Sequence, residues 1–109
     1  MFDVPAIGVA DLPDGAVLLD VREDDEWSAG HAPEARHVPM SQLTGRLDEV
    51  PPADPLYVIC RSGNRSARVV AFLSQQGVSA VNVAGGMQSW AAAGRPMVAE
   101  HAGVTPGVL

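Results

Sequence analysis

Three short runs of apolar residues, rich in branched side chains, punctuate the chain at residues 16–21, 56–60 and 80–83. Each run is too short for a helix and too continuously apolar for a strand that has one face in solvent. Such runs are typical of buried parallel strands. Two further segments are expected to complete the sheet, one at residues 4–7 and a short one at 37–40. The pattern predicts a mostly parallel sheet of about five strands.

Amphipathic segments lie between these strands, and each is followed by residues that end helices. Helices are expected at residues 24–29, 41–48, 66–76 and 87–93. Strands that alternate with helices indicate an α/β fold. The chain has 109 residues and 47% hydrophobic content, which fits one domain with a real core. We predict a domain over residues 1–100 and a C-terminal tail, rich in glycine and small residues, over 101–109.

Charge and composition exclude several classes of function. The net charge is −6, with a dense acidic run at 23–26, so nucleic acid is not an expected partner. We interpret the acidic run as a solvated helix start. Three scattered histidines show no metal-ligand spacing, and no metal or other cofactor is expected. The N-terminus lacks the pattern of a secretory signal and no stretch approaches membrane-spanning length, which predicts a cytoplasmic protein without a membrane partner.

The single cysteine, Cys60, stands where the second apolar run gives way to a polar loop and then a predicted helix. Backbone N–H groups, the positive end of a helix dipole and nearby arginines would all favour its thiolate, which is the nucleophilic form. A buried structural cysteine has no need of such a loop. Arg61, Arg65 and Arg68 follow with no acidic residue among them, so a small anion is the expected ligand.

Four segments in chain order resemble the rhodanese family in its single-domain form. They are residues 19–22 with Glu23 and Trp27, residues 30–35 leading to 37–39, residues 58–66, and residues 85–87 with Trp90 and 94–96. The resemblance covers about residues 4–98 and implies a three-layer α/β/α fold around the central sheet. Glu34 departs from the family pattern, because such proteins often carry glycine there.

The resemblance implies a thiosulfate sulfurtransferase of the rhodanese type. Sulfane sulfur would pass from thiosulfate or a related donor to a thiophilic acceptor, which is cyanide, a thiol or a protein. The nucleophile is carried over to Cys60, which would hold the sulfur as a persulfide. The loop amides would bind the donor and the persulfide, and the substrate-binding residues are Arg61, Ser62, Gly63, Asn64, Arg65 and Ser66. Arg61 is expected to meet the donor's oxygens, and Arg65 to neutralise the anion or fix the loop.

Three further residues are predicted to support the site. Asp20 and Arg22 fall at the carboxyl end of their strand, the edge where α/β sheets place ligands. We favour a structural role for both, in which they cap a turn and tie it to the acidic helix. His31 could act as a general base, but a pre-formed thiolate needs none. Its imidazole is expected to hold loop carbonyls instead.

Two other functions compete with this hypothesis. The domain could be a non-catalytic persulfide carrier or a regulatory binding module, which an intact cysteine does not exclude. A small phosphatase or arsenate reductase would also place a cysteine and an arginine in one loop around a tetrahedral anion. Those enzymes have five residues between the two, whereas four separate Cys60 from Arg65, and this shorter spacing favours sulfur transfer.

Overall fold

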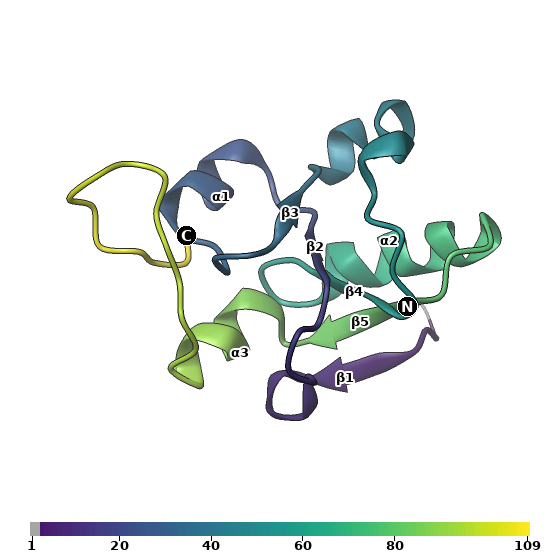
Figure 1. Ribbon diagram of the computed structural model, residues 1–109, viewed down its shortest axis with the longest axis horizontal. Coiled ribbons are helices and arrows are strands. Elements are labelled where there is room, and N and C mark those ends of the chain that lie inside the picture. Colours follow the sequence, from purple (N-terminus) through teal and green to yellow (C-terminus); the bar gives the residue numbers. More distant parts are fainter. Residues whose placement is uncertain (1–2) are drawn as a thin grey trace.

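The computed structural model describes residues 3–109 and contains one five-stranded sheet, with the strand order β1-β5-β4-β2-β3. Every paired strand is parallel to its neighbour. The strands are β1 (Ala6–Gly8), β2 (Leu18–Asp20), β3 (Arg36–His37), β4 (Leu56–Ile59) and β5 (Ala80–Ala84) (Figure 1). The prediction of an α/β fold with about five strands is confirmed, and the sheet is wholly parallel.

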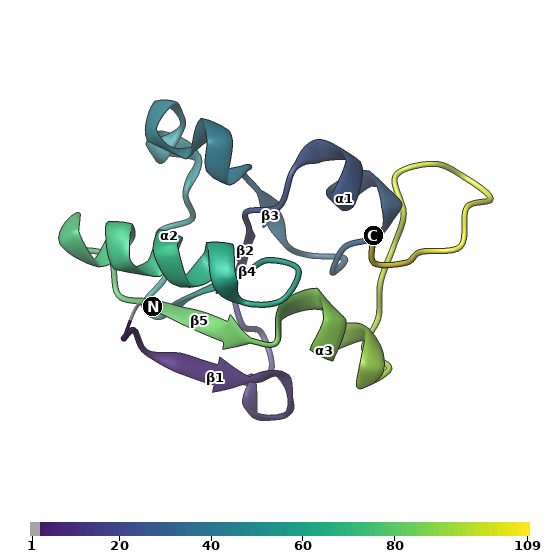
Figure 2. The ribbon, with the colours of Figure 1, turned by 180° about the vertical axis from the view of Figure 1, so that it is seen from behind.

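Helices cover both faces of the sheet. The α-helices are α1 (Asp24–Ala29), α2 (Asn64–Gln75) and α3 (Gly86–Ala92). Helix α2 buries Val69, Val70 and Leu73 in one hydrophobic cluster, and α3 buries Met87 and Trp90 in the other. Figure 2 shows α2 in front of the sheet, and Figure 1 shows the reverse side. This is the expected three-layer arrangement.

Strand β4 shows why its sequence is continuously apolar. Leu56 and Val58 point into the cluster under α2, whereas Tyr57 and Ile59 point into the cluster under α3. Successive side chains of a strand alternate between the two faces. Because both faces are covered, all four residues are buried and none is charged. The same strand ends at Cys60, so the packing of β4 fixes the position of the thiol.

The prediction of an α-helix at residues 41–48 is wrong. The chain forms two 3₁₀-helices there, Met40–Gly45 and Leu47–Glu49, and another follows β1 at Val9–Asp11. Arg46 separates the first two with a φ of −131° and a ψ of 28°, outside the helical region. Leu43 is the one buried side chain in these two turns, so little packing stabilises a longer α-helix.

Several boundaries also differ from the sequence prediction, and two of these differences have a clear local cause. The strand expected at residues 37–40 is Arg36–His37, and it ends before Pro39, which has no N–H for a ladder hydrogen bond. Helix α2 begins at Asn64 rather than at residue 66. Its N-cap is Gly63, whose φ of 106° lies in the left-handed region that favours glycine. Arg65 and Ser66 therefore lie in the first turn of α2.

Residues 101–109 fold back against α1 without forming a helix or strand. The Gly107 N–H donates to the Ala29 carbonyl at 2.9 Å, and Val108 packs against the cluster under α3. Gly30 has no room for a Cβ because the Gly107 backbone lies against it. In Figure 1 this segment swings outward and returns beside α1. The division of the chain at residue 100 stays a prediction.

None of the helices between residues 3 and 109 has the length and apolar content that a membrane crossing requires.

Candidate active site

Cys60 lies at the carboxyl end of β4, directly below the N-terminus of α2. Its side chain is 1% exposed, and three donors surround its sulfur. The Gly63 N–H donates to Sγ at 3.1 Å, the Ser66 N–H at 3.4 Å and the Ser66 hydroxyl at 3.2 Å. These donors are the free amides of a helix start and one side chain of its first turn. The arrangement stabilises negative charge on the sulfur.

The loop that follows Cys60 is fixed from below by α3. The Met87 N–H donates to the Cys60 carbonyl at 2.8 Å, and the Gln88 N–H donates to the Arg61 carbonyl at 3.0 Å. Gly86 permits this approach, because a Cβ there would overlap the backbone of Cys60 and Arg61. Gly86, the first residue of α3, therefore serves close packing against the reactive loop. Two helix N-termini meet at this edge of the sheet, one on each side of Cys60.

These surroundings lower the pKa of the Cys60 thiol. Burial by itself raises that pKa, because it disfavours the charged form. Hydrogen bonds from the Ser66 hydroxyl and from the N–H groups of Ser66 and Gly63, together with the nearby Ser62 N–H, outweigh the burial and hold the pKa below its ordinary value. A thiolate with a lowered pKa is reactive near neutral pH.

We therefore expect alkylation of Cys60 by iodoacetamide to reach half of its maximal rate at a pH below about 8.5, the ordinary value for cysteine. The rate should rise with pH because the thiolate is the reacting form. The chain holds one cysteine, so the reagent reports one site. The same protein unfolded in denaturant provides the control and should return the midpoint to its ordinary value. A folded-state midpoint at or above that of the unfolded chain would contradict the described donor set.

Arg65 forms an ion pair with Glu26 of α1. Its two terminal nitrogens donate to the two carboxylate oxygens at 2.7 and 2.8 Å. This hydrogen bonding holds the pKa of the Glu26 carboxyl below its usual range. Glu26 also accepts the Glu23 N–H at 3.1 Å within a capping box. The interpretation of the acidic run as a solvated helix start is therefore wrong for Glu26, which is partly buried, although Asp24 and Asp25 are exposed.

Asp20 and Arg22 form a fully buried ion pair at the carboxyl end of β2. Three hydrogen bonds of 2.8 to 3.1 Å join the guanidinium to the carboxylate. The Arg22 guanidinium also donates to the Glu26 carbonyl at 3.3 Å and to the Gly30 carbonyl at 2.8 Å. The pair thus holds α1 in place, and α1 carries the carboxylate that binds Arg65.

His31 directly follows Gly30, the C-cap of α1. Its Nδ1 faces the Ala32 carbonyl at 2.9 Å and its Nε2 faces the Glu100 carboxylate at 2.8 Å. The ring stacks on Trp27 with centroids 3.5 Å apart, and His37 stacks on Trp27 at 4.6 Å. None of the hydrogen bonds recorded for the His31 ring within residues 3–109 reaches the loop at 60–66. The structure does not bring His31 together with Cys60 as a hydrogen-bonded pair.

The family model of the Rhodanese-like domain matches residues 9–93. The chain belongs to the rhodanese-like domain family. A protein of Allochromatium vinosum named sulfurtransferase is 39% identical over 92 residues, which cover 84% of this chain and 85% of that one.

Solved structures agree with this assignment. A rhodanese-related protein from Thermoplasma volcanium superposes with a TM-score of 0.80 at 39% identity, over 86% of this chain and 97% of that one. A thiosulfate sulfurtransferase from Pseudomonas aeruginosa gives a TM-score of 0.74 at 26% identity, over 90% of this chain and 21% of that one. The rhodanese-like domain described here is thus similar in fold both to single-domain and to longer proteins.

The mouth of the site in this rhodanese-like domain is formed by exposed loop residues. Arg61, Ser62 and Asn64 are exposed, whereas Gly63 and Ser66 are buried. The Arg61 Nε donates to the Leu109 carbonyl, so the segment after residue 100 reaches the residue next to Cys60. This contact is an addition to the sequence prediction, which gave the tail no place in the site.

Asn82 of β5 is a site residue that the sequence analysis missed. Its Oδ1 accepts a hydrogen bond from the Ser66 hydroxyl at 2.6 Å, and its Nδ2 donates to the Gly63 carbonyl at 3.1 Å. The signal that could have found it is an asparagine inside the apolar run at 80–84. A buried amide needs polar partners, and here the partners are two residues of the reactive loop and helix.

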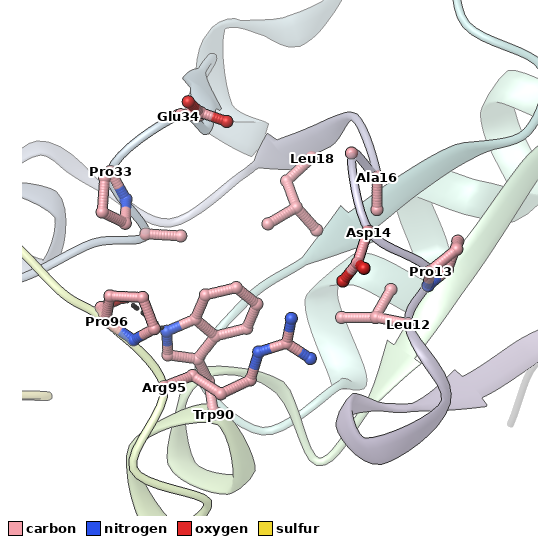
Figure 3. Close-up of a pocket in the computed structure, with 12 residues that line it drawn as sticks. Leu12, Pro13, Asp14, Ala16, Leu18, Pro33, Glu34, Trp90, Arg95 and Pro96 are labelled. Atoms are coloured by element: carbon pink, nitrogen blue, oxygen red, sulfur yellow. Dashed lines mark hydrogen bonds between the residues drawn. The ribbon is translucent and has the colours of Figure 1, made fainter.

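A separate pocket of about 320 Å³ lies between the segment after β1, the turn at residues 32–34 and the end of α3 (Figure 3). The Arg95 guanidinium lies 4.5 Å above the Trp90 ring at its wall. The residues that line it include none from the loop at 60–66. This pocket of the rhodanese-like domain is therefore distinct from the Cys60 site.

Proposed function

We propose that this rhodanese-like chain is a sulfurtransferase that carries sulfane sulfur on Cys60. Its donor is thiosulfate or a related small anion, and its acceptor is cyanide, a thiol or a protein thiol. The observation that carries this proposal is the set of three donors around the Cys60 sulfur at the start of α2. The sulfurtransferase names of its relatives support it. A cytoplasmic location fits a reaction that needs a reduced thiol.

In the first half-reaction the Cys60 thiolate attacks the outer sulfur of thiosulfate. A new S–S bond forms from a thiolate electron pair, and the S–S bond of thiosulfate breaks. The electron pair of that bond leaves with sulfite. The product is a Cys60 persulfide whose negative charge lies on the terminal sulfur. The amides of the loop at 61–66 then stabilise that terminal charge.

In the second half-reaction a thiolate or cyanide attacks the terminal sulfur. The bond between the two persulfide sulfurs breaks, and its electron pair returns to the Cys60 sulfur. The acceptor leaves as a persulfide or as thiocyanate. The three donors that surround the Cys60 sulfur stabilise it as a leaving group at this step. The two half-reactions are linked by the Cys60 persulfide, and the first product leaves before the second substrate binds. This order implies ping-pong kinetics.

The remaining site residues have positioning or binding roles in this proposal. Arg61 is exposed at the mouth, where its charge attracts the oxygens of the donor. Ser62 and Asn64 line the same opening. Arg65 is held by Glu26 and fixes the start of α2. The Asp20–Arg22 pair and His31 support the loop through α1 and the turn that follows it.

Steady-state kinetics with thiosulfate and cyanide test this proposal. We expect double-reciprocal plots at several cyanide concentrations to give parallel lines, because sulfite leaves before cyanide binds. Intersecting lines would contradict the persulfide route. Slow turnover with every small acceptor, together with fast single transfer to a protein thiol, would identify a carrier instead. Hydrolysis of an aryl phosphate at a rate that rivals sulfur transfer would replace the proposal with a phosphatase.

A further inference from the structure

The Ser66 hydroxyl has two acceptors and one hydrogen. Its oxygen lies 3.2 Å from the Cys60 sulfur and 2.6 Å from Asn82 Oδ1. An amide oxygen and a thiolate both accept hydrogen bonds and do not donate them. The hydroxyl hydrogen can therefore satisfy only one of them at a time. The two acceptors compete for this hydrogen.

The orientation of the Asn82 amide is fixed by the loop. Its Nδ2 donates to the Gly63 carbonyl at 3.1 Å. Rotation of the amide by half a turn would place Oδ1 against that carbonyl, which brings two acceptors together. Asn82 therefore presents an oxygen, and never a donor, to Ser66. If the Asn82 position presented an N–H group to the Ser66 oxygen instead, the Ser66 hydrogen would always be available to the Cys60 sulfur.

The three groups that share this hydrogen are buried, so water does not readily take the place of a lost hydrogen bond. Cys60 is 1% exposed, Ser66 is fully buried and Asn82 is 8% exposed. The same hydroxyl must serve both acceptors in turn, and the charge on sulfur decides between them, because a charged acceptor forms the stronger hydrogen bond.

We propose that Asn82 is a positioning residue that holds the Ser66 hydrogen while the Cys60 sulfur is neutral and releases it when the sulfur becomes a thiolate. In the reaction proposed above, on which this kinetic part rests, the charge leaves the Cys60 sulfur in the first half-reaction. The hydroxyl then turns to Asn82. The charge returns in the second half-reaction, and the hydroxyl turns back to the departing sulfur. Ser66 thus assists the discharge of the persulfide more than its formation.

Other charged groups around the site do not take part in this exchange. Arg65 of α2 is paired with Glu26 of α1, and Arg61 of the loop reaches the Leu109 carbonyl. Substitutions at Ser66 and Asn82 leave all of these charges in place. A change in the titration of Cys60 among such variants therefore reports the hydroxyl and not the local charge.

A double-mutant cycle tests the proposal through the pH dependence of Cys60 alkylation by iodoacetamide. Ser66→Ala removes the hydroxyl and should raise the midpoint by about one unit, because a donor to the thiolate is lost. Asn82→Leu removes the rival acceptor and should lower the midpoint by about half a unit. In the double variant the Asn82 effect should vanish, since no hydroxyl remains to be released. Ser74→Ala, an exposed serine of the same helix, serves as the control and should not shift the midpoint.

An Asn82 effect of equal size with and without Ser66 would overturn the proposal, because Asn82 would then act through the fold alone. An unchanged or raised midpoint in Asn82→Leu would overturn it as well. Circular dichroism checks that each variant folds. If Asn82→Leu does not fold, Asn82→Ala takes its place in the cycle.

A second measurement needs no substitution at Asn82. In Ser66→Ala, at a pH above both midpoints, transfer of the persulfide sulfur to a small thiol should slow about tenfold, while loading from thiosulfate should not slow. Equal slowing of both steps would contradict the proposal. Alkylation does not depend on sulfur transfer. A native protein that never takes up sulfur would therefore contradict the proposed function. The alkylation cycle would still test whether Asn82 controls the Ser66 hydrogen.

Discussion

Replacement of Cys60 by serine is expected to lower sulfur transfer from thiosulfate to cyanide by about a thousandfold or more. The chain holds one thiol, so no second cysteine can relay the sulfur. A serine hydroxyl keeps the size of the side chain, but it is not ionised near neutral pH and does not form a stable link to sulfane sulfur. Formation of thiocyanate, followed by colour development with ferric ion, measures the rate.

The matched control is Ser74→Ala, which changes an exposed side chain of α2 outside the reactive loop and leaves the donors at Gly63 and Ser66 in place. It should retain activity within a few-fold of the native protein. A Cys60→Ser variant that keeps a tenth or more of the native rate would place the chemistry elsewhere.

The largest effect on stability is expected at Arg22. Arg22→Ala should lower the free energy of unfolding by about 3–5 kcal/mol, the range for removing one partner of a buried ion pair. The Asp20 carboxylate would then be buried without its guanidinium, and the carbonyls of Glu26 and Gly30 would lose their donor. Urea unfolding followed by tryptophan fluorescence measures the change.

Two variants complete this experiment. Arg36→Ala removes an exposed arginine and should change the free energy of unfolding by less than about 0.5 kcal/mol. The double variant Asp20→Asn with Arg22→Met removes both charges and should recover part of the loss, because no uncompensated charge stays buried. A loss below about 1 kcal/mol in Arg22→Ala would mean that the pair contributes little to the fold.

Local patterns predicted the parts of the site that lie close together in sequence. The apolar run that ends at Cys60 predicted β4, and the glycine and arginines after it predicted a loop at a helix start. Gly63 shows the limit of this approach, since its left-handed φ of 106° begins α2 two residues earlier than the amphipathic pattern indicated. Composition favours a loop there, whereas the backbone already has helical angles from Asn64.

Contacts between distant segments could not be predicted in the same way. Glu26 and Arg65 are separated by 39 positions, and the pairing depends on where the fold places α1 relative to the first turn of α2. Asn82 reaches Ser66 across 16 positions because β5 lies next to β4 in the sheet. The helix expected at residues 41–48 failed for a related reason. Its apolar spacing was adequate, but its side chains find little packing in the folded chain.

The mass of the intact protein after incubation with thiosulfate tests the central claim most directly. The account predicts that the native chain becomes heavier by one sulfur atom, that cyanide or a small thiol removes the added sulfur, and that Cys60→Ser gains none. A native chain that stays at its original mass, or a serine variant that takes up sulfur, would contradict a persulfide on Cys60.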